Sequence, residues 1–170
     1  KVAYADTGVW SKKAIEEARR FYSTVDVVAS SRDRGCCYIP KLDKVEGDYD
    51  YVHITLNNTI FGTKWEHLPD TGTIPLVADI SSCILSEPLD VSKFGLLYAG
   101  AQKNLAPAGV TVVIVREDLI REDLPSSVPT MLRYDTHAKN GSMFNTPPTY
   151  PIYVMGLVLD WVKEQGGAEG

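Results

Sequence analysis

A lysine, an aspartate and a threonine stand at matching points of three short apolar segments. Thr59 lies shortly after segment 51–56, Asp79 ends segment 75–79, and Lys103 lies shortly after segment 94–98. In open α/β sheets, ligands bind outside the carboxyl ends of the strands. If the three segments are neighbouring strands, the hydroxyl, the acid and the amine meet in one crevice.

These three side chains have the chemistry that pyridoxal phosphate needs from a protein. The amine of Lys103, which follows the small residues 99–101, can form a Schiff base with an aldehyde cofactor. Asp79 can keep the ring nitrogen of the cofactor protonated, and Thr59 can hydrogen-bond its phenolic oxygen. Spacing alone also allows less specific roles, since a loop lysine is usually solvated and an aspartate after a strand is often a helix cap or turn former. On this basis alone the sequence predicts an α/β ligand-binding domain whose chemistry stays open.

The spacing of apolar residues predicts the elements that must position these side chains. Residues from Ala14 to Tyr22 have helical spacing, with charged residues on the opposite side. Strands are predicted at 2–6, 25–29, 51–56, 75–79, 94–98 and 110–115, and residues 30–50 are predicted as a loop with a minor strand. The short, partly polar connections favour an α/β layer over a β-sandwich.

The last strand and the last helix of this pattern are strongly apolar. Segment 110–115 is rich in β-branched residues without alternation, which is typical of a strand covered on both faces. A helix is predicted at about 152–164, after Pro147 and Pro148, and it is apolar around most of its circumference. We therefore expect much of that helix to be buried.

Composition excludes several classes of function. The chain has 170 residues, of which 44% are hydrophobic and 23% charged, as in an ordinary globular domain. Its net charge of -5 argues against nucleic-acid binding, which needs a basic surface. No apolar run is long enough to span a membrane, and no secretion signal opens the chain.

Neither metal binding nor nucleotide binding is indicated by any motif. His53, His67 and His137 lack metal-ligand spacing and are expected to be structural or surface residues, and neither the dinucleotide-binding nor the P-loop glycine pattern occurs. Cys36 and Cys37 are adjacent, which suits neither a disulfide nor a zinc site, and with Cys83 they are expected to be reduced, as in a cytoplasmic protein. The chain starts directly in a strand and stops just after a helix, so we expect it to be a segment of a longer protein.

Four strings of the sequence are recognisable together and in order. They are DTGVWSKKAIEEA from residue 6, HITLNNTIFGT from residue 53, PLVADISSCILSEPLDVSKFGLLYAGAQKN from residue 75, continuing into LAPAGVTVVIVRED, and NGSMFNTPPTYPIY from residue 140. They closely resemble the phosphoserine aminotransferases, a class-V family of fold-type-I pyridoxal-phosphate enzymes. The resemblance spans nearly the whole chain and is weakest between residues 23 and 50.

The resemblance implies a role for each matching residue. Lys103 would bind the cofactor covalently and move the α-proton of the substrate, Asp79 would pair with the pyridine nitrogen, and Thr59 would contact the phenolic oxygen. Trp10 would stack on the ring and Gln102 would bind the cofactor phosphate. Two further residues, Asn145 and Thr146, would reach the cofactor phosphate of a neighbouring subunit, which implies a homodimer with shared active sites.

The implied reaction is transamination between L-glutamate and 3-phosphohydroxypyruvate, which gives O-phospho-L-serine and 2-oxoglutarate in serine biosynthesis. In many bacteria the family also serves pyridoxine biosynthesis. The implied fold is the three-layer, mostly parallel α/β large domain of fold-type-I enzymes, with residues 1–170 forming part of it. The N-terminal part and the C-terminal small domain, which carry substrate-binding residues in the family, lie outside this sequence.

Three other functions compete with this one. Another fold-type-I enzyme, such as an alanine–glyoxylate aminotransferase or a cysteine desulfurase relative, would share the fold. A desulfurase needs a reactive cysteine in a mobile loop, whereas Cys83 follows Asp79 closely and is expected to face the core. A nucleotide-binding module lacks its glycine motifs here. A catalytically incompetent fragment remains the third alternative, because the isolated segment lacks the substrate-binding parts.

Overall fold

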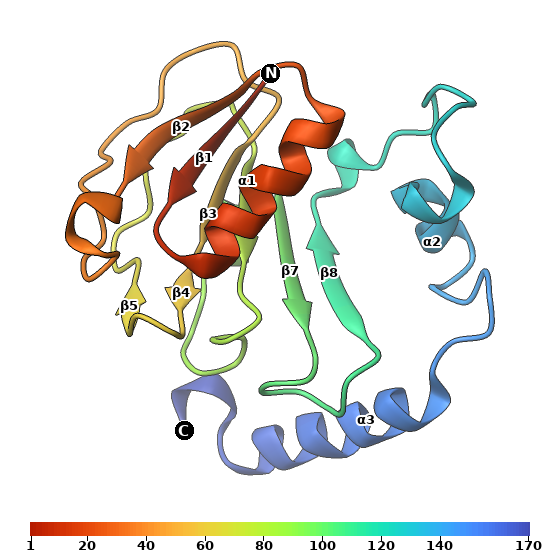
Figure 1. Ribbon diagram of the computed structural model, residues 1–170. Coiled ribbons are helices and arrows are strands. Elements are labelled where there is room, and N and C mark those ends of the chain that lie inside the picture. Colours follow the sequence, from red (N-terminus) through yellow and green to blue (C-terminus); the bar gives the residue numbers. More distant parts are fainter.

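A six-stranded sheet forms the centre of the structure, a computed structural model that describes residues 1–170 (Figure 1). Its strand order is β2-β1-β3-β6-β7-β8, and β8 alone runs antiparallel to its neighbour. The strands are β1 (Val2–Asp6), β2 (Val25–Ser30), β3 (Val52–Thr55), β6 (Leu76–Asp79), β7 (Leu96–Gly100) and β8 (Thr111–Val115). This confirms the predicted mostly parallel α/β sheet and all six predicted strands.

Three helices accompany the sheet. They are α1 (Val9–Phe21), α2 (Tyr134–Lys139) and α3 (Thr149–Glu164). Figure 1 shows α1 lying across one face of the sheet, while α3 runs past the carboxyl end of β7. Short 3-10 turns occur at Arg32–Arg34, Val91–Lys93, Glu117–Leu119, Thr130–Leu132 and Gly167–Glu169. The first and last helices agree with prediction, whereas the short α2 was not predicted.

A small hairpin follows β3 directly. It consists of β4 (Asn57–Asn58) and β5 (Thr63–Lys64), which pair antiparallel. Thr59 lies in the turn between them, and this hairpin was not predicted from the sequence. Two-residue strands carry too few side chains to show alternation, which is why the pattern gave no signal.

Alternate residues of each strand face opposite sides of the sheet, and the two sides are packed differently. One side holds the main core, which includes Ile54, Ala78 and Leu97. The other side carries Tyr4 and packs against Ile15 of α1. The buried stripe of α1 matches the helical spacing seen in the sequence.

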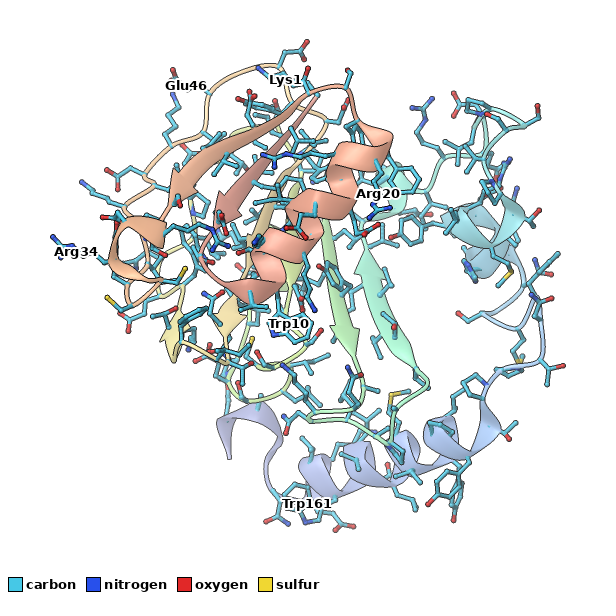
Figure 2. All side chains as sticks on the ribbon, viewed as in Figure 1. Lys1, Trp10, Arg20, Arg34, Glu46 and Trp161 are labelled. Atoms are coloured by element: carbon cyan, nitrogen blue, oxygen red, sulfur yellow. The ribbon has the colours of Figure 1, made fainter.

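The expected burial of β8 and α3 is wrong for this chain. Val113 and Ile114 of β8 are 38% and 43% exposed, and α3 has no buried residue. The physical reason is that β8 is an edge strand, paired with β7 alone, and that α3 lies outside both packed faces of the sheet. Figure 2 shows Trp161 of α3 pointing away from the sheet. None of the helices has the length and apolar character needed to cross a membrane.

Candidate active site

Lys103 and Thr59 are in direct contact at the carboxyl edge of the sheet. The Nζ atom of Lys103 donates a hydrogen bond of 3.0 Å to Oγ1 of Thr59. Thr59 follows β3 and Lys103 follows β7, with β6 lying between these two strands. The sheet therefore brings together two side chains that are far apart in the sequence, as the crossover topology of parallel strands requires.

Trp10 lies on the same edge, in the first turn of α1. The Nζ atom of Lys103 is 5.8 Å from the centroid of the Trp10 ring. The ring is 42% exposed, and Figure 2 shows it at the end of α1 that is nearest the carboxyl ends of the strands. A partly exposed aromatic ring thus lies next to the amine.

Asp79 ends β6, between the strands that lead to Thr59 and Lys103. Its Oδ1 accepts a hydrogen bond of 2.9 Å from the backbone N–H of Ser81. This turn is the one that an aspartate after a strand often makes, and it fixes the carboxylate. The Oδ2 atom makes no hydrogen bond in the structure, so a ligand nitrogen could be bound there.

Gln102 folds back onto the end of β7. A Cβ atom at Gly100 would lie only 2.6 Å from Oε1 of Gln102, so this conformation depends on glycine. The N–H of Gly100 donates to Oγ of Ser81 at 3.0 Å, which ties β7 to the turn that holds Asp79. Ser81 thus joins two parts of the site, the end of β7 and the turn after β6.

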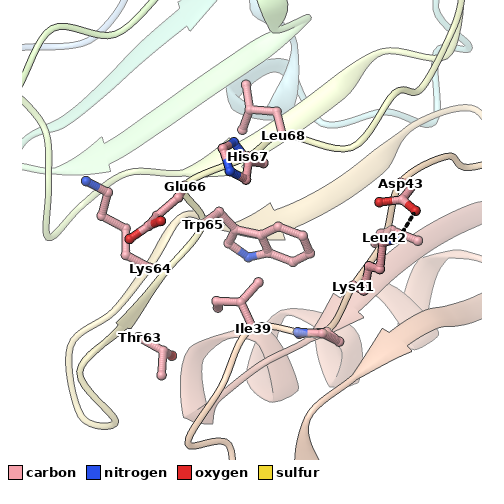
Figure 3. A pocket seen from close by; sticks show the side chains of 11 residues that line it. Ile39, Lys41, Leu42, Asp43, Thr63, Lys64, Trp65, Glu66, His67 and Leu68 are labelled. Carbon is pink, nitrogen blue, oxygen red and sulfur yellow. Dashed lines mark ion pairs between the residues drawn. The ribbon is translucent and has the colours of Figure 1, made fainter.

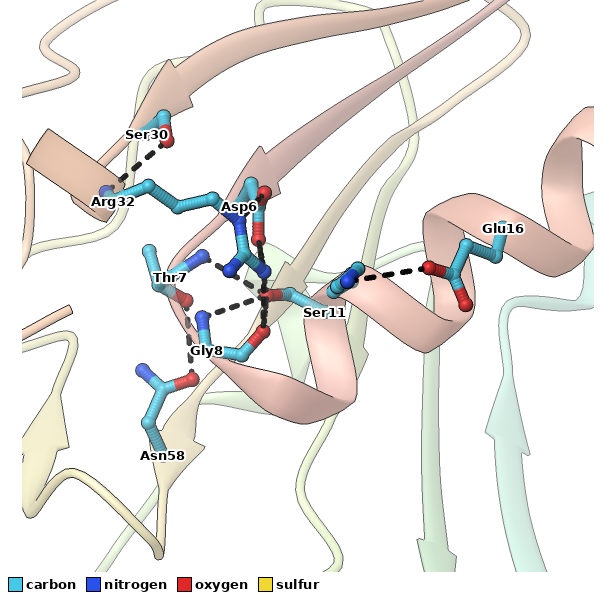
Figure 4. Close-up of polar contacts among 9 residues, drawn as sticks. Asp6, Thr7, Gly8, Ser11, Glu16, Ser30, Arg32 and Asn58 are labelled. Carbon is cyan, nitrogen blue, oxygen red and sulfur yellow. Dashed lines mark hydrogen bonds and ion pairs between the residues drawn. The ribbon is translucent and has the colours of Figure 1, made fainter. Parts of the chain in front are cut away.

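A buried polar network links the start of α1 to the hairpin that carries Thr59 (Figure 4). Oγ of Ser11 accepts hydrogen bonds of 2.9 Å from the N–H groups of Thr7 and Gly8. The hydroxyl of Thr7 donates to Oδ1 of Asn58 at 3.1 Å. A Cβ atom at Gly8 would lie 2.9 Å from the same Oδ1, so the close approach requires glycine. The network thereby fixes Ser11, which follows Trp10, and Asn58, which precedes Thr59.

Arg32 completes this network from the turn after β2. Its guanidinium forms a two-point ion pair with Asp6, in which Nη2 lies 2.8 Å from Oδ1, and Nη2 also donates to the carbonyl of Gly8. The Asp6 partner raises the pKa of Arg32 further above its usual range. No motif assigned Arg32 to any role, because an ion pair across 26 positions leaves no local pattern in the sequence.

Asn145 and Thr146 lie apart from Lys103. Both are exposed, and together with β8 and α2 they line a cavity of about 560 Å³ that contains none of the residues just described. The side-chain amide of Asn145 donates to the sulfur of Met131 at 3.1 Å. The chain therefore does not bring these two residues to its own Lys103.

Cys83 lacks the properties of a nucleophile. It packs against the main core, and burial raises the pKa of its thiol to about 11. A thiol with such a pKa is almost entirely protonated near neutral pH, whereas reactive cysteines are thiolates. This agrees with the expectation that Cys83 faces the core and weakens the case for desulfurase chemistry.

A separate cavity lies beside the hairpin formed by β4 and β5 (Figure 3). It measures about 600 Å³ and is lined by Ile39, Leu42, Lys64, Trp65 and neighbouring residues. Its two lysines are paired within the chain, Lys41 with Asp43 and Lys64 with Glu87. It contains none of the predicted site residues, so the candidate site is the open carboxyl edge of the sheet.

Comparison with known proteins agrees with this geometry. The family model for class-V aminotransferases matches residues 1–169. A phosphoserine aminotransferase from Lysinibacillus sphaericus is 56% identical over 169 residues, which cover 98% of this chain and 46% of that protein. The chain thus spans about half the length of the curated relatives it matches.

Solved structures give the same result. The phosphoserine aminotransferase from Bacillus circulans subsp. alkalophilus superposes with a TM-score of 0.93 at 48% identity, over 99% of this chain and 47% of that one. The pyridoxal-phosphate-bound phosphoserine aminotransferase from Trichomonas vaginalis superposes with a TM-score of 0.89 at 36% identity, over 99% and 48% of the two chains.

Proposed function

This chain belongs to the class-V aminotransferase family, and we propose that the protein carrying it is a phosphoserine aminotransferase. The reaction is transamination between L-glutamate and 3-phosphohydroxypyruvate, with O-phospho-L-serine and 2-oxoglutarate as products. The observation that carries the proposal is the contact of Lys103 with Thr59, which follow β7 and β3, the strands on either side of the one that ends in Asp79.

The residues at this edge fit pyridoxal phosphate. Bound there, the cofactor supplies an aldehyde for covalent attachment and a ring that draws electrons from the α-carbon of the substrate. Lys103 is the amine within reach, Asp79 has an unused carboxylate oxygen for the ring nitrogen, and Trp10 offers a ring face. The named relative from Trichomonas vaginalis is described as bound to the same cofactor.

Each residue then has a task. Lys103 would hold the cofactor covalently and would move a proton at the α-carbon of the substrate as general base. Asp79 keeps the ring nitrogen protonated, Thr59 hydrogen-bonds the phenolic oxygen and orients Lys103, and Trp10 excludes water from one ring face. Gln102 contributes to phosphate binding.

Residues 1–170 are part of the large, cofactor-binding domain in this proposal, and substrate-binding residues lie in the remainder of the protein. Asn145 and Thr146 would contact the cofactor of a second subunit. In their own chain they line a cavity that does not include Lys103. The protein is accordingly a homodimer with two shared sites. The three free cysteines suit the cytoplasm.

The alternative fold-type-I chemistries have less support. The half-buried, protonated thiol of Cys83 does not suit a desulfurase, and the relatives that are more than half identical carry the phosphoserine aminotransferase name. An alanine–glyoxylate enzyme would use the same lysine and aspartate, so the substrate test must separate the two.

The test is turnover by the whole protein on two substrate pairs. We expect 2-oxoglutarate from L-glutamate with 3-phosphohydroxypyruvate, and at most about a hundredth of that rate from L-alanine with glyoxylate, a difference of about 3 kcal/mol in transition-state binding. The isolated segment should be inactive on both pairs. A preference for L-alanine with glyoxylate would contradict the proposal.

A further inference from the structure

His53 and Tyr98 are joined by a hydrogen bond that crosses the strand carrying Asp79. His53 lies on β3 beside Val77 of β6, and Tyr98 lies on β7 beside Asp79 of β6. Nε2 of His53 and the hydroxyl of Tyr98 are 3.0 Å apart. Because β6 lies between β3 and β7, this bond passes over β6 at the level just below Asp79.

The pair is held rigidly on the side of the sheet that α1 covers. The His53 ring stacks on Tyr4, with centroids 4.7 Å apart, and faces Tyr98 on its other side at 5.9 Å. His53 is only 3% exposed. An imidazole confined between two aromatic rings cannot turn toward solvent, so its position relative to Asp79 is fixed.

Burial keeps both members of the pair uncharged. It lowers the pKa of His53 to about 4, against the opposing attraction of Asp79, and it raises the pKa of Tyr98. A charged imidazolium at this place would attract the carboxylate of Asp79 and compete with any cation bound above it. His53 and Tyr98 line a cavity on this side of the sheet, and the other titratable groups around it are Tyr4, Tyr22, Asp50, Tyr51 and Tyr134.

Two polar atoms of this layer have no partner in the protein. Nδ1 of His53 and Oγ1 of Thr55 are buried and make no hydrogen bond. Thr55 of β3 lies directly beside Asp79 of β6. Unsatisfied buried polar atoms cost free energy, so apolar residues would give a more stable sheet. Residues that reduce stability beside a proposed cofactor-binding carboxylate are expected to serve function instead.

We propose that His53 and Tyr98 are positioning residues for Asp79. They form the uncharged layer on β3 and β7 beside Asp79 and so leave its negative charge to the ring nitrogen of the bound cofactor. The inference rests on the proposed function and adds two residues to it. Neither residue touches the cofactor or the substrate, so neither is a catalytic residue.

The first test uses the whole protein without cofactor. Histidines are labelled with ¹³C, and the His53 resonance, assigned by its loss in His53→Gln, is titrated with acid. Because Asp79 attracts the charged form of His53, Asp79→Asn should lower the titration midpoint of His53. A midpoint that is the same in both proteins would overturn the coupling. This measurement decides whether His53 and Asp79 are coupled, even if the protein proves to bind no cofactor at Lys103.

The second test uses the loaded enzyme and the single-atom change Tyr98→Phe. We expect kcat to fall about tenfold while KM for L-glutamate changes less than about twofold, since only transition-state stabilisation is lost. The absorption band of the bound cofactor should also titrate at a shifted pH. Tyr51→Phe is the matched control, because it removes a tyrosine pair with Tyr4 (2.7 Å) away from Asp79. Unchanged kcat in Tyr98→Phe, or an equal loss in Tyr51→Phe, would overturn the proposal.

Discussion

Nζ of Lys103 and Oγ1 of Thr59 lie 3.0 Å apart although 44 positions separate the two residues. The hydrogen bond spans the edge of the sheet above β6, where Asp79 ends its strand. It holds the exposed lysine amine at the carboxyl edge of the sheet. The proposed chemistry depends on this orientation.

Thr59→Val removes the hydroxyl that accepts the hydrogen bond from Lys103. The lysine side chain should then be less well oriented, while its amine remains present. We expect the cofactor to remain attached and kcat to fall about tenfold, which corresponds to about 1.4 kcal/mol. Steady-state kinetics check this, with Thr73→Val, an exposed loop residue, as the matched control. A Thr59→Val enzyme with full activity would contradict the orienting role.

Asp79→Asn should separate the structural role of Asp79 from its chemical role. The amide oxygen can still accept the hydrogen bond from the Ser81 N–H, so the turn is retained. A neutral amide cannot hold a ring nitrogen protonated, and we expect a loss of about 2–4 kcal/mol, or roughly thirty- to a thousandfold in rate. The measurement is single-turnover kinetics, with circular dichroism to confirm the fold.

Ser11→Ala should destabilise the start of α1. It leaves the buried N–H groups of Thr7 and Gly8 without their acceptor, and we expect a loss of about 1–3 kcal/mol. Urea denaturation measures the loss, with the exposed Ser23→Ala as control. If Ser11→Ala unfolds at the same urea concentration as the parent, the network does not stabilise this helix.

Acid should destabilise the protein in part through His53. Its pKa is about 4 in the fold and near the ordinary 6.5 when unfolded, so the unfolded state binds more protons between these two values. Stability attributable to His53 is therefore present above about pH 6.5 and lost as the pH falls toward 4. The Tm of His53→Gln should vary less over this window than that of the parent, whereas the exposed His67→Gln should vary as the parent does.

Much of the fold could be predicted because its strands are short, apolar and separated by clear polar breaks. Asp79 at the end of β6 and Lys103 shortly after β7 also lie where the strand pattern predicts them, whereas their roles stay predictions. Two kinds of feature could not be predicted. The exposure of β8 and α3 depends on what the rest of the fold covers, and pattern alone reports only that these segments are apolar.

Long-range polar partners are the second kind. The pairs of Arg32 with Asp6 and of His53 with Tyr98 join elements that only the sheet order brings together. His53 was predicted to be a structural or surface residue, because a histidine inside an apolar strand has no distinguishing spacing. Its neighbours become visible only when strand order and register are known.

The most direct test of the central claim is to locate the covalent attachment of the cofactor. The whole protein is loaded with pyridoxal phosphate, reduced with borohydride and mapped by peptide mass spectrometry, and Lys103→Ala is treated in parallel. We predict a pyridoxyl group on Lys103 in the parent, none in the variant, and no transamination by the variant. A pyridoxyl group on another lysine, or full activity in Lys103→Ala, would contradict the account.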